Sequence, residues 1–214
     1  MEKGSAMKAL ILANGAFPVS EKLLLELKEA EFLAVCDGGV CHLEHLDIEP
    51  DVIIGDLDSI TKELKEKYSQ KIIHIKEQES NDLSKAFFHC VNLGYDEFTI
   101  LGATGKREDH TIANISLLSV YINHCKSVVM KSDFGTFSVY KTPCQIPSQE
   151  GEQISIFTPN PQTILTSKGL KYPLNHLALP LWANGTLNEA LGESFSLDSE
   201  NEGECVILYH SFLK

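Results

Sequence analysis

The sequence predicts an α/β domain with a mostly parallel, doubly wound sheet, followed by a small all-β sandwich domain. From residue 8 to about residue 132, short runs rich in Val, Ile and Leu alternate with amphipathic helical stretches. This pattern is typical of strands that are buried on both faces and connected by helices. After Asp133 the helical stretches stop, and strand-like segments follow one another between Pro, Gly and Asn turns. We therefore expect an α/β domain over residues 1–135 and a β-sandwich over residues 136–214.

The first domain should contain six strands joined by helices. The predicted strands are residues 8–13, 32–36, 52–55, 71–75, 97–101 and 127–132. Ser20 and Ser59 are placed to cap two of the helices, and Asn81 opens a third that ends at Gly94. A fourth helix is expected from about residue 109 to 124, and its buried stripe should comprise Ile112, Ile115, Leu118 and Ile122.

The second domain should consist of strands only. The predicted strands are residues 136–140, 153–157, 163–166, 194–197 and 205–209. Trp182, the only tryptophan, lies among Leu and Pro residues, and we expect it in the core. A sandwich of this length is small, so it should pack against the first domain or a second subunit.

Composition excludes several classes of function. Against 18 Lys and Arg stand 30 Asp and Glu, so the formal net charge is −12, which disfavours nucleic-acid binding. No apolar stretch approaches the length of a membrane span. The six cysteines are scattered without a C-x-x-C motif, which predicts reduced thiols, no structural zinc and a cytoplasmic location.

Polar residues follow five successive strands of the first domain. Because ligands bind outside the carboxyl ends of parallel strands, these segments should meet at one edge. They are Asn14-Gly15 after the first strand, Asp37-Gly38-Gly39 after the second, Gly55-Asp56-Leu57-Asp58-Ser59 after the third, Asn81-Asp82 with Lys85 after the fourth, and Gly102-Ala-Thr-Gly105-Lys106-Arg107-Glu-Asp109-His110 after the fifth.

Each of these segments, taken alone, has an ordinary structural interpretation as a turn or a helix cap. Taken together they do not, because four converging carboxylates (Asp37, Asp56, Asp58 and Asp82) repel one another unless a cation compensates them. Mg²⁺ carried in with nucleotide phosphates is the natural compensating ion. We expect Asp37, Asp56 and Asp58 to bind metal, and the pattern does not single out which acid, if any, is a general base.

Glycines and cations in the same segments favour a polyphosphate ligand. Glycines let backbone N–H groups approach phosphates, and Lys and Arg side chains supply positive charge. The expected nucleotide-binding residues are Gly15, Gly38, Gly39, Lys85, Gly102, Gly105, Arg107, Asp109 and His110. For Gly15 and His110 a plain turn and a plain cap are comparable alternatives. The spacing matches neither the Walker A loop nor the dinucleotide G-x-G-x-x-G motif.

The order and spacing of these motifs, with Gly169-Leu-Lys-Tyr172-Pro-Leu174 in the second domain, resemble thiamine pyrophosphokinases over nearly the whole chain. The resemblance implies an α/β nucleotide domain, a β-sandwich and a homodimer. It also implies a reaction in which ATP, with Mg²⁺, transfers its diphosphoryl group to thiamine, giving thiamine diphosphate and AMP.

Carried over residue by residue, the resemblance assigns the four aspartates to the metal and phosphate region. Tyr172 would stack on thiamine, and Thr186 and Asn188 would lie near it. An alternative for Tyr172 is a place in the core of the small domain. Two residues depart from the family pattern: Lys106 stands where a glycine is common, and Leu187 stands where a serine is usual.

Two other functions remain open on the sequence. One is a Mg²⁺-dependent phosphotransferase that releases ADP, and the other is a non-catalytic sensor of nucleotide or thiamine. Acids at four of the five strand ends argue against the sensor, since binding alone has little use for so many.

Overall fold

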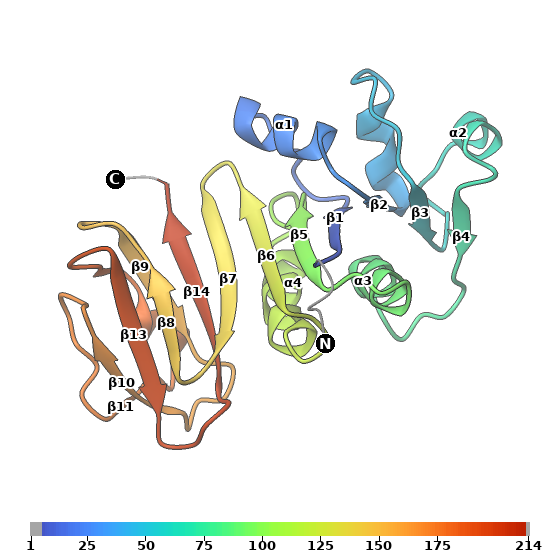
Figure 1. The fold of residues 1–214 in the computed structure, drawn as a ribbon. Helices are drawn as coiled ribbons and strands as arrows, with labels where there is room; N and C mark the ends of the chain where they lie inside the picture. Colours follow the sequence, from blue (N-terminus) through green and yellow to red (C-terminus); the bar gives the residue numbers. More distant parts are fainter. Residues whose placement is uncertain (1–5, 213–214) are drawn as a thin grey trace. The chain divides into compact units, whose positions relative to one another are not determined.

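The computed structural model describes residues 6–212. The chain divides into two compact units, residues 1–133 and residues 134–214, which we call the first and second units (Figure 1). The first unit contains a parallel sheet with helices, and the described part of the second contains antiparallel strands and a short 3₁₀ helix but no α-helix. The predicted fold class is confirmed.

Six strands form the sheet of the first unit. They are β1 (Lys8–Leu12), β2 (Leu33–Cys36), β3 (Val52–Gly55), β4 (Ile72–His74), β5 (Glu97–Leu101) and β6 (Ser127–Ser132). Their order is β6-β5-β1-β2-β3-β4, and every neighbouring pair is parallel. Apart from Lys8 at the start of β1, the residues of β1, β2 and β3 are buried because helices cover both faces, which explains the nearly continuous apolar sequences of these strands.

Helices pack on both faces of this sheet. Helix α1 (Glu21–Lys28), the 3₁₀ helix η1 (Asp37–Leu43) and helix α2 (Lys62–Lys67) share one apolar cluster with side chains of β1, β2 and β3. Helices α3 (Asp82–Asn92) and α4 (Glu108–Tyr121) pack against each other, with the Phe87 and Tyr121 rings stacked at a centroid distance of 4.0 Å. The sheet is therefore doubly wound.

Helix ends follow the sequence signals in one case and depart from them in another. The Asn81 side chain accepts a hydrogen bond from Ser84 N at 2.9 Å and caps α3 as predicted. Ser59 does not cap α2. Thr61 does so, because its hydroxyl accepts from Leu64 N at 3.4 Å.

The predicted stripe of α4 was wrong in part. Ile115 and Leu118 are buried, but Ile112 is 59% exposed, and the buried face is completed by Asn114 and Tyr121. Apolar residues surround this helix almost evenly, so their spacing alone did not define the buried face.

The second unit is a sandwich of two antiparallel sheets. Its strands are β7 (Gly135–Lys141), β8 (Cys144–Pro147), β9 (Gln153–Phe157), β10 (Ile164–Lys168), β11 (Leu177–Ala178), β12 (Asn188–Glu189), β13 (Ser194–Ser199) and β14 (Cys205–Ser211). One sheet has the order β12-β9-β14-β7 and the other β11-β10-β13-β8. Buried side chains from both sheets form one apolar core.

Three further sequence-based expectations can be compared with the structure. All six cysteines are free thiols, as predicted. Trp182 was expected in the core, but it lies in the short 3₁₀ helix η2 (Trp182–Gly185), is 36% exposed and packs on Phe157. Among the described residues, no helix has the length and apolar character needed to cross a membrane.

Candidate metal and nucleotide site

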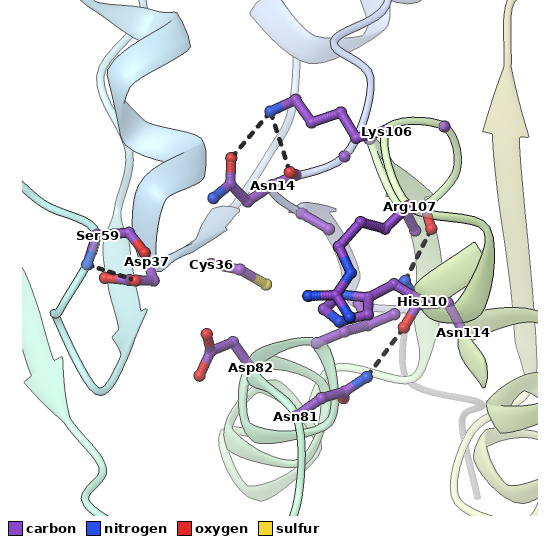
Figure 2. Close-up of a pocket in the computed structure, with 16 residues that line it drawn as sticks. Asn14, Cys36, Asp37, Ser59, Asn81, Asp82, Lys106, Arg107, His110 and Asn114 are labelled. Atoms are coloured by element: carbon purple, nitrogen blue, oxygen red, sulfur yellow. Dashed lines mark hydrogen bonds between the residues drawn. The ribbon is translucent and has the colours of Figure 1, made fainter. Parts of the chain in front are cut away.

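The largest set of predicted site residues meets at a cavity of about 410 Å³ in the first unit (Figure 2). It lies at the carboxyl ends of β1 and β5, where the order of strands reverses direction, and this is where open α/β sheets bind ligands. The cavity is lined by Ala13, Asn14, Gly15, Cys36, Asp37, Ser59, Asn81, Asp82, Leu83, Gly102, Ala103, Gly105, Lys106, Arg107, His110 and Asn114.

Three carboxylates gather beside the cavity, and two of them, Asp37 and Asp82, line it. Oxygen atoms of Asp37, Asp56 and Asp82 all lie within 4.8 Å of one another. Gly55 makes this approach possible, because a Cβ atom there would lie 2.7 Å from Asp37 Cβ and 3.3 Å from Asp82 Cγ. The glycine before Asp56 is therefore a requirement of the site.

The environment of Asp37 leaves one of its oxygens without a partner. Its Oδ2 accepts a hydrogen bond from Ser59 N at 3.1 Å. Its Oδ1 is buried and has no hydrogen-bond partner among the described residues. A buried carboxylate oxygen without a donor is costly, and a cation would satisfy it.

Asp82 lies in the first turn of α3 and adds a second negative charge beside Asp37. Lys85 Nζ lies 3.2 Å from Asp82 Oδ1, and this is the only salt bridge to the three carboxylates within residues 6–212. Burial raises the pKa of Asp82, Lys85 opposes that rise, and the charges of Asp37 and Asp56 add to it. One lysine for three acids leaves excess negative charge, which a divalent cation would compensate.

Asp58 does not join this group, contrary to the expected pairing of Asp56 and Asp58. The intervening Leu57 has a φ of 69°, so the chain turns sharply between the two acids. Only the backbone N–H of Asp58 faces Asp56, donating to Asp56 Oδ1 at 3.1 Å and lowering the pKa of Asp56. The third carboxylate of the group is therefore Asp82, whereas the sequence-based prediction of the metal ligands named Asp58.

The opposite wall is a loop rich in left-handed backbone. Gly102, Gly105 and Lys106 have φ values of 66°, 74° and 61°. A Cβ atom at Gly102 would lie 2.7 Å from the Ala13 carbonyl oxygen, so only glycine fits there. Gly15 N donates to Gly102 O at 2.5 Å, and this bond ties the loop to the end of β1.

Arg107 and Asp109 form a forked ion pair on this wall. Arg107 Nε lies 3.0 Å from Asp109 Oδ1, and Nη2 lies 2.5 Å from Oδ2. Hydrogen bonds from Arg107 and from the His110 backbone lower the pKa of Asp109 to about 2. Arg107 and His110 line the cavity, whereas Asp109 lies outside the lining and holds Arg107 in place.

Two amides that the sequence-based prediction did not assign to the site, the exposed Asn81 and the buried Asn114, line the cavity and are hydrogen-bonded to each other. Asn114 Nδ2 donates to Ala103 O at 2.8 Å, and its Oδ1 accepts from Asn81 Nδ2 at 2.9 Å. Asn114 is 8% exposed, and a polar residue on the inner face of an apolar helix was a usable signal. Cys36 also lines the cavity, and burial raises the pKa of its thiol.

The remaining predicted residues of the first unit support the lining rather than form it. Gly38 lies against the Asn14 amide, and a Cβ atom at Gly39 would lie 3.2 Å from Leu12 O. Lys85 is buried beneath the carboxylates. These residues shape and charge the cavity without facing it.

The predicted residues of the second unit divide into exposed and buried groups. The Tyr172 side chain is 60% exposed, so it does not cover the core. Asn188 is buried, and its side chain accepts from Tyr172 N at 3.1 Å and donates to Tyr172 O at 2.8 Å. Thr186 is exposed and donates to Ala183 O at 3.0 Å. Asn188 therefore holds Tyr172, and its amide is already occupied.

Fold and site together define a class of protein. A doubly wound α/β unit carries an acidic metal site and a cationic loop around one cavity, and a β-sandwich unit follows it. This combination is typical of an enzyme domain for nucleotide chemistry with a divalent metal ion, joined to a second, substrate-recognition module.

Comparison with known proteins identifies the family within this class. The family model of the thiamin pyrophosphokinase catalytic domain matches residues 23–130, and that of the thiamin pyrophosphokinase substrate-binding domain matches residues 135–209. The chain therefore belongs to the thiamin pyrophosphokinase family. Membership implies ATP and thiamine as substrates and a divalent metal ion.

Individual relatives agree with this assignment. Thiamine pyrophosphokinase 1 from Oryza sativa subsp. japonica is 29% identical over 209 residues, which cover 83% of this chain and 78% of the relative. Thiamin pyrophosphokinase 1 from Caenorhabditis elegans is 27% identical over 141 residues, and the match covers 61% of this chain but only 58% of the relative.

A solved structure shares the fold. The crystal structure of thiamine pyrophosphokinase from Bacillus subtilis superposes with a TM-score of 0.80 at 22% identity, covering 97% of this chain and all of that chain (100%).

Proposed function

We propose that this protein transfers the diphosphoryl group of ATP to the hydroxyl of thiamine, giving thiamine diphosphate and AMP. The observation that carries the proposal is the group of three carboxylates beside a cavity that is also lined by the cationic residues Lys106 and Arg107, with one buried oxygen of the group, Asp37 Oδ1, lacking a hydrogen-bond partner among the described residues. Carboxylates for a metal ion and cations for phosphate oxygens are the two parts that phosphoryl transfer requires.

The acidic wall fits a magnesium ion. Asp37, Asp56 and Asp82 supply hard oxygen ligands, and the single lysine near them leaves negative charge uncompensated. A bound Mg²⁺ would neutralise charge on the phosphate oxygens and polarise the β-phosphoryl group under attack. We assign these three residues as its ligands and leave Asp58 outside the set.

The cationic wall fits the polyphosphate. Arg107 enters the cavity with its guanidinium fixed by Asp109, so little side-chain freedom is lost when it binds an anion. His110 stands beside it, and the backbone around Gly102 and Gly105 allows close approach of phosphate oxygens. These residues hold and orient ATP while the thiamine oxygen attacks the β-phosphorus.

In the second unit we assign Tyr172 to the contact with thiamine. Its exposed ring offers a face to a flat cationic heterocycle, and Asn188 fixes the backbone that presents it. Thr186 is proposed to lie beside it. We further propose that the protein acts as a homodimer, as the family resemblance implies, and that it works in the cytoplasm, consistent with its six free thiols.

The products of the reaction test this proposal. Purified protein is mixed with ATP, thiamine and Mg²⁺, and nucleotides and thiamine phosphates are separated by chromatography. AMP and thiamine diphosphate should appear in equal amounts, and omission of thiamine should suppress AMP. ADP with thiamine monophosphate would identify a γ-phosphoryl kinase instead, and binding of both ligands without turnover would identify a sensor.

A further inference from the structure

Lys106 occupies a strained turn at the mouth of the nucleotide cavity. The Arg107 N–H donates to Gly105 O at 2.8 Å, which closes a three-residue turn with Lys106 at its centre, at a φ of 61°. This form of γ-turn is rare and strained, and a lysine pays a conformational cost there that glycine avoids. Strain of this kind is kept where a side chain has a role.

The turn sends the Lys106 side chain across the mouth to the end of β1. Its Nζ donates to both the backbone O and the side-chain Oδ1 of Asn14, each at 3.2 Å (Figure 2). A lysine ammonium can only donate, so the amide atom that faces it must be oxygen. Lys106 therefore fixes the orientation of the Asn14 amide and turns its nitrogen away.

The nitrogen of this amide faces the acidic side of the cavity. In Figure 2, Asn14 Nδ2 points toward the side where Asp37 and Ser59 lie. A Cβ atom at Gly38 would lie only 2.5 Å from Asn14 Nδ2, so the glycine after Asp37 leaves room for the amide. No acceptor in the described part of the chain takes a hydrogen bond from Nδ2.

We propose that Asn14 is a substrate-binding residue whose Nδ2 donates a hydrogen bond to a polyphosphate oxygen, and that Lys106 is the positioning residue that aims it. The amide nitrogen is a hydrogen-bond donor without a free lone pair for a metal ion, and on the exposed Asn14 it is open to a ligand that enters the cavity, so it complements an anionic oxygen of that ligand. The inference rests on the proposed function to the extent that the cavity takes a nucleotide.

Binding of Mg²⁺–ATP without thiamine, measured by titration calorimetry, tests the role of Asn14. Asn14→Asp keeps the size of the side chain and the acceptors for Lys106 but replaces the donor with a negative charge. Asn14→Ala removes the donor without adding charge. Both variants should bind at least about tenfold more weakly than wild type, as expected for a lost hydrogen bond to a charged group.

A matched control separates the site effect from net charge. Asn92 is exposed near the end of α3, and Asn92→Asp makes the same charge change with no expected loss of binding. Wild-type affinity in Asn14→Ala, with weakening confined to Asn14→Asp, would overturn the proposal, because charge repulsion alone would then explain the loss.

The role of Lys106 is tested by a double-mutant cycle and by rescue. Lys106→Met should weaken Mg²⁺–ATP binding in the wild-type background, have no further effect in Asn14→Ala, and be rescued by Lys106→Arg, which also only donates. An equal loss in both backgrounds would mean that Lys106 contacts the phosphate itself and would overturn the positioning role. Lys106→Gly should retain or raise the thermal midpoint, because it relieves the strained turn.

These results can be told apart from failure of the proposed function. If wild type binds Mg²⁺–ATP and Asn14→Ala does not, but no AMP forms with thiamine, the role of Asn14 stands and the diphosphoryl transfer fails. If AMP forms and all Asn14 variants bind and react as wild type, the function stands and this inference fails. Absence of Mg²⁺–ATP binding in the wild type would overturn both.

Discussion

The two units differ in how firmly they hold the side chains of their candidate functional residues. In the first unit the acids and cations lie around one cavity and are held by short polar contacts: Ser59 N on Asp37, Lys85 on Asp82, Asp109 on Arg107. In the second unit the candidate contact, Tyr172, is 60% exposed; Asn188 holds its backbone, and the Lys171 ammonium lies 5.9 Å from the centroid of its ring.

This difference follows from the chemistry each unit has to do. Charges that repel must be placed before the ligand arrives, and fixed dipoles and charges are worth most when they need no rearrangement during reaction. An aromatic contact to a flat ring needs only an accessible face, because its gain comes from buried area and the π system. The first unit should therefore control turnover, and the second should control affinity for thiamine.

The largest expected effect comes from removing charge at the centre of the acidic wall. Asp37→Asn keeps the shape and the acceptor for Ser59 N but loses the charge that a metal ion would meet. We expect kcat to fall by about 10²–10³, the scale of lost electrostatic stabilisation. Asp58→Asn is the matched comparison, and its kcat should stay within the same order of magnitude because its carboxylate lies outside the group. Equal losses in both variants would contradict the assignment.

That pair of aspartates also shows how far the sequence could predict the site. The rule that carboxyl ends of parallel strands share one edge correctly brought Asp37, Asp56 and Asp82 together. It could not place Asp58, since the decisive feature is the φ of 69° at Leu57. Leucine seldom adopts a left-handed conformation, so its sequence carries no signal for this turn.

The fold was predicted best where local and tertiary preferences agree. Strands β3, β5, β6 and β9 have the predicted bounds, because each is a β-branched or apolar run that ends in turn residues or charge. The two-residue strands β11 and β12 and the 3₁₀ helix η1 were not predicted. They depend on pairing with distant partners or on a loop of glycines, and neither leaves a periodic pattern.

A smaller effect should come from the ring of Tyr172 in the second unit. Its side chain is 60% exposed, so Tyr172→Ala should leave the thermal midpoint unchanged. The KM for thiamine should rise several-fold, as expected if about 0.5–2 kcal/mol of ring stacking is lost. The KM for ATP should stay constant, and steady-state kinetics with each substrate varied in turn would show this. Equal increases in the KM values for thiamine and ATP would contradict the assignment of thiamine affinity to the second unit.

Asn188→Ala provides the contrasting variant on the same contact. It removes both hydrogen bonds to the Tyr172 backbone from a buried position, so it should destabilise the second unit by about 1–3 kcal/mol. Urea unfolding followed by Trp182 fluorescence measures this loss. Tyr172→Ala and Asn188→Ala should therefore separate the binding role of the ring from the structural role of the amide.

The smallest expected effect concerns acid stability, and it compares the units directly. The carboxyl groups whose pKa is lowered are Glu49, Asp56, Glu63, Glu77, Asp96, Asp109 and Asp133, and all lie in the first unit. A carboxyl group with a lowered pKa in the folded state contributes stability above its unfolded pKa of about 4 and loses that contribution as the pH falls. For Asp109 the loss extends down to a pKa of about 2. Acid should therefore weaken the first unit before the second.

Two optical signals distinguish the units in one sample. The four α-helices of the described chain all belong to the first unit, so circular dichroism at the helix band follows it. Trp182, the only tryptophan, reports on the second unit. Between about pH 4 and pH 2 the helix signal should change at higher pH than the tryptophan emission. The difference between the two midpoint pH values should be small. It should decrease in concentrated salt, because two of the lowered pKa values come from exposed ion pairs that salt screens, Glu49 with Lys71 and Asp109 with Arg107. Asp109→Asn should reduce this difference in midpoint pH further, since the variant has no carboxylate to protonate at that position. Loss of the tryptophan signal first would mean that the acid-sensitive contacts lie in the sandwich, and the electrostatic contrast between the units would be wrong.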